Sequence, residues 1–242
     1  NEWNNVRKPQ FLLKDLEIRE WQLFDYRGNR RIEGWIEKIP EGNRLFILFH
    51  KEYFEKEEFQ FLRNQAVLVD SLEKARNLDL DGKNVVFLDM PTHRAVIESL
   101  LQSKSPSRIY THFYQENGQF FRVIPTREHF KWYYAFLLKK GTVDIGRMIH
   151  EISRYKGWTP DTIHFMTKVF FELEFVTMDN GKIFISREPK KRDLSESATY
   201  RNTLEIIALE KELLYSSYQE LKTWFDHKLA RANIEEEKVL WT

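Results

Sequence analysis

Cysteine is absent from all 242 residues, which excludes disulfide bonds, cysteine zinc sites and thiol catalysis. Charge of one sign is missing too. The 38 lysines and arginines balance the 37 aspartates and glutamates to a formal net charge of +1, so any nucleic-acid binding must come from a local patch. No apolar run is long enough to span a bilayer and no signal peptide is visible, so we expect no membrane partner and a cytoplasmic location.

Motifs that mark enzymes are also missing. The sequence contains no G-x-x-x-x-G-K-[ST], no G-x-G-x-x-G, no H-E-x-x-H and no G-x-S-x-G. The seven histidines form no ligand set at metal spacing, and we interpret His93 and His112 as structural. The sequence therefore predicts no catalytic residue, no metal ligand and no cofactor for this chain.

Apolar runs alternate with helical patterns between residues 19 and 124. Residues 45–49 and 85–88 are continuously apolar, as in strands that are covered on both faces. This spacing predicts an α/β fold with an open, mostly parallel sheet and helices on both faces. We expect strands at 23–26, 45–49, 66–69, 85–88 and 108–113, helices at 32–39, 53–62, 71–77 and 92–101, and an antiparallel edge strand at 119–124.

Two aspartates follow apolar runs in this part. Asp70 and Asp89 stand where open α/β sheets bind ligands, which invites a metal or nucleotide interpretation. We favour helix capping instead. Asp70 precedes Glu73 by three residues, which is a capping-box spacing, and Asp89 lies just before an expected helix start.

Residues 125–242 follow a different pattern. A helix over 127–140 leads to a short strand at 142–144, a helix that Gly157 ends, and a second helix that starts at Thr159-Pro160-Asp161. Apolar residues at 175–178 and 182–185 flank Asn180-Gly181, which is a strong hairpin signal. This order predicts a winged helix-turn-helix. Two further helices are expected at 195–215 and 218–229.

A winged helix commonly binds nucleic acid, but its second helix here carries a single cation, Lys168, among acids, so base reading in a major groove is doubtful. Trp158 in the turn is either a base-stacking residue or, as we favour, a plug between helices. The hairpin and the loop after it are basic, and we predict that they meet phosphates, with a merely solvated loop as the alternative. The candidate DNA-binding residues are Trp158, Lys168, Lys182, Arg187, Lys190, Lys191 and Arg192.

Several strings resemble one family along essentially the whole chain. They are EWN at 2–4, RKPQFLLKDL at 7–16, EWQLFDYRG at 20–28, PTREHF at 125–130, VFFELEFV at 169–176 and LYSSYQEL at 214–221. These strings resemble the C-terminal region of the longer RecJ proteins, which are bacterial single-strand-specific DNA exonucleases. They carry no catalytic signature.

The resemblance implies a division of the chain and a role. Residues 1–18 would be the last strand of a truncated oligonucleotide-binding fold, 19–124 an α/β domain like that of helicases but without a P-loop, and 125–242 the winged helix with C-terminal helices. RecJ nucleases hydrolyse single-stranded DNA from the 5′ end with Mn²⁺ or Mg²⁺ on an Asp-His-His motif that does not occur here. We expect the metal only in a nuclease core outside this sequence, which begins with Asn and is expected to continue a longer protein.

We therefore expect a non-catalytic accessory region that helps a single-strand DNA exonuclease to hold DNA during repair and recombination. Its expected partners are single-stranded DNA and its own nuclease core. The alternative is a protein-docking module that recruits a helicase or a single-strand-binding protein, which the near-zero net charge and the acidic, aromatic second helix favour. A third interpretation is nucleotide binding at the strand ends of Asp70 and Asp89.

Overall fold

The structure is a computed structural model that describes residues 21–29, 31–116, 118, 124–186 and 190–239, with side chains up to residue 229. The expected strand within 1–18, most of the expected edge strand at 119–124 and Arg187 lie outside the described residues. Among the described helices, none is both long and apolar enough to cross a bilayer.

The first region is built on a five-stranded sheet in the order β1-β5-β4-β2-β3, and every pair in it is parallel. All six residues of β4 are buried, because this central strand is covered on both faces. The prediction of an open parallel α/β sheet is confirmed. The strands are β1 (Gln22–Asp25), β2 (Arg44–Leu48), β3 (Ala66–Leu68), β4 (Asn84–Asp89) and β5 (Arg108–Tyr114).

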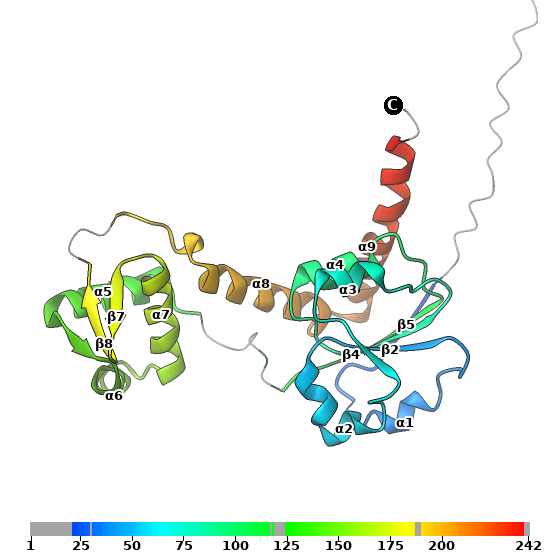
Figure 1. The fold of residues 1–242 in the computed structure, drawn as a ribbon, viewed down its shortest axis with the longest axis horizontal. Coiled ribbons are helices and arrows are strands. Elements are labelled where there is room, and N and C mark those ends of the chain that lie inside the picture. The colour runs from blue at the N-terminus through cyan, green and yellow to red at the C-terminus, as the bar shows by residue number, and fades with distance from the viewer. Residues whose placement is uncertain (1–20, 30, 117, 119–123, 187–189, 240–242) are drawn as a thin grey trace, which may run out of the picture.

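Helices cover both faces of this sheet (Figure 1). Alternate residues of β4 separate its two cores, with Val85 and Phe87 on one side and Val86 and Leu88 on the other. One face carries α3 (Leu72–Asn77) and α4 (Arg94–Leu101), and the other carries α1 (Glu33–Ile36), η1 (Lys51–Glu55) and α2 (Glu57–Gln60). The single helix expected over 53–62 is wrong, because the extended backbone of Lys56 separates η1 from α2.

The capping roles predicted for the two aspartates are also wrong. Ser71, not Asp70, is the N-cap of α3 and accepts a hydrogen bond from the backbone N–H of Lys74, while exposed Asp70 pairs with the Lys74 ammonium. Asp89 is fully buried and accepts hydrogen bonds from the backbone N–H groups of Phe49 (2.8 Å) and His50 (3.0 Å). It joins the end of β4 to the end of β2 rather than starting a helix.

The second region consists of three helices and a small antiparallel sheet of order β6-β8-β7. Its elements follow the order helix, strand, helix, helix, hairpin that the sequence predicted. They are α5 (Arg127–Lys140), β6 (Val143–Asp144), α6 (Ile145–Lys156), α7 (Pro160–Glu172), β7 (Val176–Asp179) and β8 (Lys182–Ile185).

Local signals set the ends of these elements. The side chains of Thr126, Asp144 and Thr159 cap α5, α6 and α7 by accepting backbone N–H groups. Gly157 ends α6 in the left-handed conformation at φ 71°, which a residue with a Cβ rarely adopts. Inside, the Tyr133 hydroxyl lies 2.6 Å from Thr167 Oγ1, and burial raises the pKa of Tyr133 to about 12.

The C-terminal helices pack on the α/β sheet. After η2 (Leu194–Glu196), α8 (Ala198–Leu213) runs from the second region to the first, and α9 (Tyr218–Val239) then leads away from the sheet (Figure 1). Leu209, Leu213, Leu221 and Phe225 are buried in the same core as α3 and α4. The helices that the sequence grouped with 125–242 thus complete one face of the first region.

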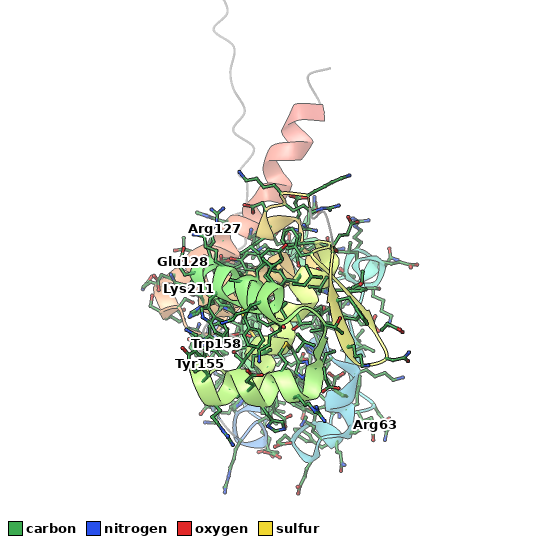
Figure 2. The ribbon with its side chains drawn as sticks, turned by 90° about the vertical axis from the view of Figure 1, so that its left-hand side faces the viewer. Arg63, Arg127, Glu128, Tyr155, Trp158 and Lys211 are labelled. Carbon is green, nitrogen blue, oxygen red and sulfur yellow. The ribbon has the colours of Figure 1, made fainter. Side chains whose placement is uncertain are left out.

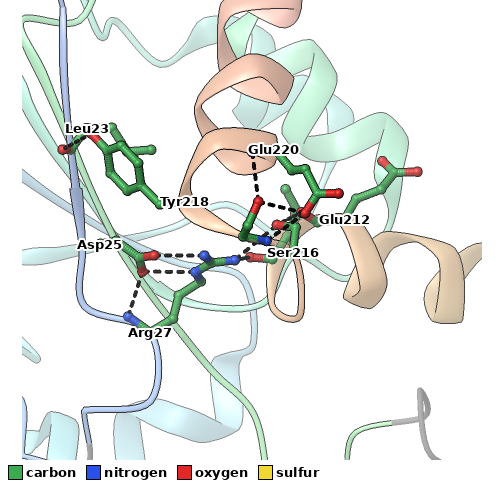
Figure 3. A network of polar contacts seen from close by, with 9 residues as sticks. Leu23, Asp25, Arg27, Glu212, Ser216, Tyr218 and Glu220 are labelled. Atoms are coloured by element: carbon green, nitrogen blue, oxygen red, sulfur yellow. Dashed lines mark hydrogen bonds and ion pairs between the residues drawn. The ribbon is translucent and has the colours of Figure 1, made fainter.

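Polar contacts fasten β1 to the turn between α8 and α9 (Figure 3). Arg27 donates from Nη1 to the Leu213 carbonyl (2.8 Å) and to Ser216 Oγ (3.1 Å), and its other guanidinium nitrogens pair with Asp25. Partial burial alone would raise the pKa of Asp25, but the hydrogen bonds from Arg27 bring it below its ordinary value. Tyr218 adds a hydrogen bond from its hydroxyl to the Leu23 carbonyl (3.2 Å).

Candidate nucleic-acid interface

A pocket of about 520 Å³ lies between α5, the start of α8 and the loop that precedes η2. Its volume is within the range of pockets that enclose a small organic ligand. Cations and aromatic rings supply most of its lining. The lining residues are Arg127, Phe130, Lys131, Tyr134, Phe170, Phe175, Lys190, Lys191, Arg192, Asp193, Leu194 and Tyr200.

The aromatic residues form the floor of the pocket and are packed edge to face. The ring centroids of Phe130 and Phe170 lie 5.6 Å apart, those of Phe170 and Phe175 5.6 Å apart, and those of Phe130 and Tyr200 6.0 Å apart. Phe130 and Phe170 are buried, whereas Phe175 and Tyr200 are half-buried. The floor is therefore a preformed apolar surface, in which the half-buried rings of Tyr134, Phe175 and Tyr200 are the ones accessible to a ligand.

Five cations rim this floor. Arg127, Lys190 and Lys191 form no ion pair with a described residue, whereas the Lys131 ammonium lies 2.7 Å from a Glu128 carboxylate oxygen. Arg192 donates from Nη2 to a Glu174 carboxylate oxygen at 2.8 Å. An anion at the rim would thus meet three cations that form no ion pair with a described residue, beside the acid Asp193.

The loop that carries these cations has a defined end. The Asp193 carboxylate accepts hydrogen bonds from the backbone N–H and the hydroxyl of Ser195. The Glu196 carboxylate in turn accepts a hydrogen bond from the Asp193 backbone N–H. Hydrogen bonds from Ser195 lower the pKa of Asp193, which keeps this residue an anion. The capping box fixes the loop directly after Arg192 and so positions the rim.

Trp158 lies on a different side of α5, outside the pocket lining. It is half-buried and packs edge to face against Trp132 (5.2 Å) and His129 (5.1 Å) of α5. It therefore plugs the junction of α5 with the turn between α6 and α7. Figure 2 shows the face that carries Trp158 and Tyr155.

Comparison with known proteins gives the chain a family. A profile for the family described as "Single-strand DNA-specific exonuclease, C terminal domain" matches residues 22–225. The chain belongs to this family. It is 42% identical over 226 residues to the single-stranded-DNA-specific exonuclease RecJ of Bacillus subtilis strain 168, and the match covers 93% of this chain but 29% of that protein. No solved structure matches the chain.

The resemblance to RecJ proteins that the sequence indicated is thereby confirmed. The chain spans less than a third of the relative's length, and the match is to the C-terminal part of that protein. Within the part of this RecJ-family chain that the structure describes, no three His, Asp or Glu side chains gather where they could bind a metal ion.

The structure brings together only some of the DNA-binding residues that the sequence predicted. Lys190, Lys191 and Arg192 line one pocket. Lys168 is exposed on α7 and Lys182 is exposed at the start of β8, and neither lines that pocket. Arg187 lies outside the described residues. A contact with DNA stays a prediction for each of these residues.

Sequence reasoning missed Arg127 and Lys131. These residues and Tyr134 stand at positions i, i+4 and i+7 of α5, so they share the helix face that forms a wall of the pocket. The signal was present in the sequence as a basic and aromatic stripe. It was not recognised because the partner loop at 190–194, which lies far along the chain from this helix, had to be placed against it first.

At the carboxyl edge of the parallel sheet, where a nucleotide was the third interpretation, the Asp89 carboxylate is engaged by internal contacts beside a pocket of about 270 Å³ that His50 and Met90 help to line. The Asp89 carboxylate lies 2.8 Å from His50 Nδ1 in addition to its two backbone donors. The hydrogen bond with Asp89 raises the pKa of His50, and burial raises the pKa of Asp89. His112 lies between the carbonyl oxygens of Leu88 (3.0 Å) and Asn29 (2.7 Å), as expected for a structural histidine.

Proposed function

We propose that this chain is an accessory region of a RecJ-like, single-strand-specific 5′–3′ exonuclease and that it holds single-stranded DNA at the pocket between α5 and residues 190–194. The single observation that carries the proposal is a preformed aromatic floor surrounded by five cations. Bases stack on aromatic rings whatever their sequence, and phosphates pair with the surrounding cations. Base stacking and phosphate pairing both suit a strand that is bound without regard to its sequence.

The proposal includes a division of labour. Residues 125–185 would be a winged helix that contributes its first helix rather than its second, because α5 carries the cations and α7 carries Asp161, Glu172 and Lys168. Residues 19–124 would be the α/β domain and 1–18 the last strand of an oligonucleotide-binding fold. Hydrolysis, with Mn²⁺ or Mg²⁺, would belong to a nuclease core outside this sequence.

The test is fluorescence anisotropy of labelled single-stranded oligonucleotides with the 242-residue chain across a salt series. Removing three phosphate contacts with Lys190→Ala, Lys191→Ala and Arg192→Ala together should weaken binding and flatten the plot of log affinity against log salt by about two units. An unchanged slope in the triple variant contradicts the proposal.

A matched control is Lys38→Ala, Lys83→Ala and Lys104→Ala, which removes the same charge from the first region. Because long-range steering falls off within a Debye length, this control should leave the slope nearly unchanged. A control that flattens the slope as strongly as the rim variant would point to non-specific attraction instead.

A second candidate function is protein docking, with a helicase or a single-strand-binding protein as the partner. It is favoured by three exposed apolar side chains on α7 and the hairpin, namely Phe171 (46% exposed), Met178 and Phe184. A pull-down of the two partner classes at low salt tests it, since loss of capture in Phe171→Ser with Phe184→Ser would assign the surface, and no capture by the unaltered chain would count against it.

A further inference from the structure

A second aromatic surface lies outside the pocket, where α6 packs on α5. The Trp132 ring stacks on Tyr155 of α6 with centroids 6.1 Å apart and planes at 20°, and on Phe136 with centroids 5.5 Å apart and planes at 21°. Trp132 and Phe136 are half-buried, but Tyr155 is 75% exposed. The end of this row of rings is therefore open to solvent.

Cations accompany the row. The Lys156 ammonium lies 4.4 Å from the centroid of the Trp132 ring and 5.4 Å from that of Tyr155. At the other end, the Lys140 ammonium lies 5.6 Å from the Phe136 ring, but it is already paired with Glu151 at 2.7 Å. Lys156 forms no ion pair with a described residue, so its charge is available to an anion beside the rings.

The turn at Gly157 and Trp158 fixes the position of this row of rings. Gly157 ends α6 in the left-handed conformation directly after Lys156, and the chain turns so that Trp158 packs edge to face on Trp132 at 5.2 Å. Aromatic groups that are already ordered lose little entropy when a ligand stacks on them. Tyr155 thus extends an ordered stack rather than standing alone on a mobile side chain.

The row and the pocket share α5. Lys131 faces the pocket, and its neighbour Trp132, which is turned by about 100° around the helix, faces α6. Arg127, one turn before Lys131, likewise faces the pocket, and His129, one turn before Trp132, contacts Trp158. A strand that lies along the pocket rim needs only to cross one helix, about 10–12 Å wide, to reach the rings.

We propose that Tyr155, Trp132 and Lys156 form a stacking platform for a base of single-stranded DNA that is also held at the pocket. This inference rests on the proposed function and adds a second contact on the same strand. The ring face of Tyr155 takes a base, and Lys156 takes an adjoining phosphate. The nearby acids Glu128 and Glu151 are each already paired with a lysine of α5.

The experiment measures anisotropy for oligothymidylates of increasing length, from 2 to about 16 nucleotides, with the 242-residue chain and its variants. Tyr155→Ala should weaken binding of the longer oligonucleotides by about 5- to 100-fold and leave the salt slope unchanged, because stacking carries no charge. The shortest oligonucleotides, which fill the pocket alone, should bind Tyr155→Ala and the unaltered chain equally. Tyr155→Phe, which keeps the ring, should behave as the unaltered chain.

Lys156→Ala separates charge from stacking. It should flatten the salt slope by about 0.7 units, which is the expected share of one phosphate of a single strand. Leu138→Ala is the matched control, because Leu138 is an exposed apolar residue of α5 (54%) outside both surfaces, and it should bind as the unaltered chain does.

The outcomes separate the two proposals. If the rim triple variant loses affinity and Tyr155→Ala does not, the platform is overturned and the proposed function stands. If the unaltered chain binds no oligonucleotide at low salt, the proposed function fails and the platform with it. A loss in Tyr155→Ala that is equal at all lengths, or that Tyr155→Phe shares, also overturns the platform.

Discussion

The two regions of this molecule use their charged and aromatic residues in opposite ways. In the parallel-sheet region, Asp89 is surrounded by three nitrogen donors and His112 by two carbonyl oxygens, all inside the protein. In the helix and hairpin region, Lys190 and Lys191 stand at a pocket with no described acid paired to them, and Tyr155 is left in solvent. Groups that are paired inside the protein are not available to a ligand. Cations that pair with no described acid and rings that are exposed to solvent are available to one.

The helix α8 joins the regions, and its two ends are held in different ways. At its C-terminal half, Glu212 accepts a two-pronged hydrogen bond from Arg94 (2.7 and 2.9 Å) and another from Trp224 Nε1 (2.9 Å), beside a buried apolar core. At its start, Glu172 of α7 accepts hydrogen bonds from Ser197 Oγ (2.6 Å) and the Thr199 N–H (2.9 Å). The first end is held mainly by packing and the second largely by one carboxylate.

Asp89→Ala should have the largest effect on stability, a loss of about 3–5 kcal/mol in the free energy of unfolding. The substitution leaves the His50 ring, the buried N–H of Phe49 and the partly buried N–H of His50 without their acceptor. Urea unfolding measures it. Asp70→Ala, which breaks only an exposed pair with Lys74, should change stability by less than about 1 kcal/mol, and equal losses in the two variants would contradict the contrast.

Glu172→Gln should cost about 1–2 kcal/mol, because it weakens the cap of α8 at the junction of the regions. Desolvation alone would raise the pKa of Glu172, but hydrogen bonds from Ser197 and Thr199 bring it below the ordinary value of 4.5. A carboxyl whose pKa is lowered by folding stabilises the protein fully above its pKa in the unfolded chain. This contribution is lost as the pH falls through its pKa in the folded protein. The difference in unfolding free energy between Glu172→Gln and the unaltered chain should therefore shrink from pH 6 to pH 3, and a constant difference would refute it.

Arg127→Ala together with Lys131→Ala should flatten the salt slope of single-strand binding by about 1.4 units, which is two phosphate contacts. The thermal unfolding temperature should hardly change, because both side chains are exposed. A salt series of anisotropy titrations measures the slope. A double variant with the unaltered slope would remove α5 from the interface and leave the loop alone.

Lys168→Ala and Lys182→Ala should have the smallest effects. Each removes one exposed cation that does not line the pocket, so the slope should change by at most about 0.7 units in either variant. A change larger than that of the α5 pair would move the interface to α7 and the hairpin. The same titrations give the answer, with Lys38→Ala as the single-charge control.

Much of the architecture was readable from the sequence because it depends on local chemistry. The apolar runs at 45–49 and 85–88 predicted buried parallel strands, and Thr159-Pro160-Asp161 and Asn180-Gly181 predicted where α7 begins and the hairpin turns. Some predictions failed for local reasons, since Ser71 rather than its neighbour Asp70 caps α3, whereas at Asp89 a tertiary contact overrode the local pattern. Asp89 has a helix-start context, but the end of β2 lies close enough to take its carboxylate instead.

The site followed the same rule in part. Lys190, Lys191 and Arg192, which line the pocket, were predicted as DNA-binding residues because a run of cations is visible in one stretch of sequence. Arg127 and Lys131 were not, because their importance depends on a loop that folds back onto α5. The row from Phe136 to Tyr155 likewise joins two helices, and no spacing within either helix predicts its stacking.

The sequence by itself determined the α/β class, the order of helices and hairpin, the absence of standard catalytic motifs and the likeness to RecJ proteins, since each rests on residues that are close together along the chain. Only the tertiary structure decided that α8 and α9 complete the sheet region, that Asp89 is an internal anchor and that two aromatic surfaces flank α5. The physical reason is that packing and electrostatics act through distance in space, and folding brings together residues that the sequence separates.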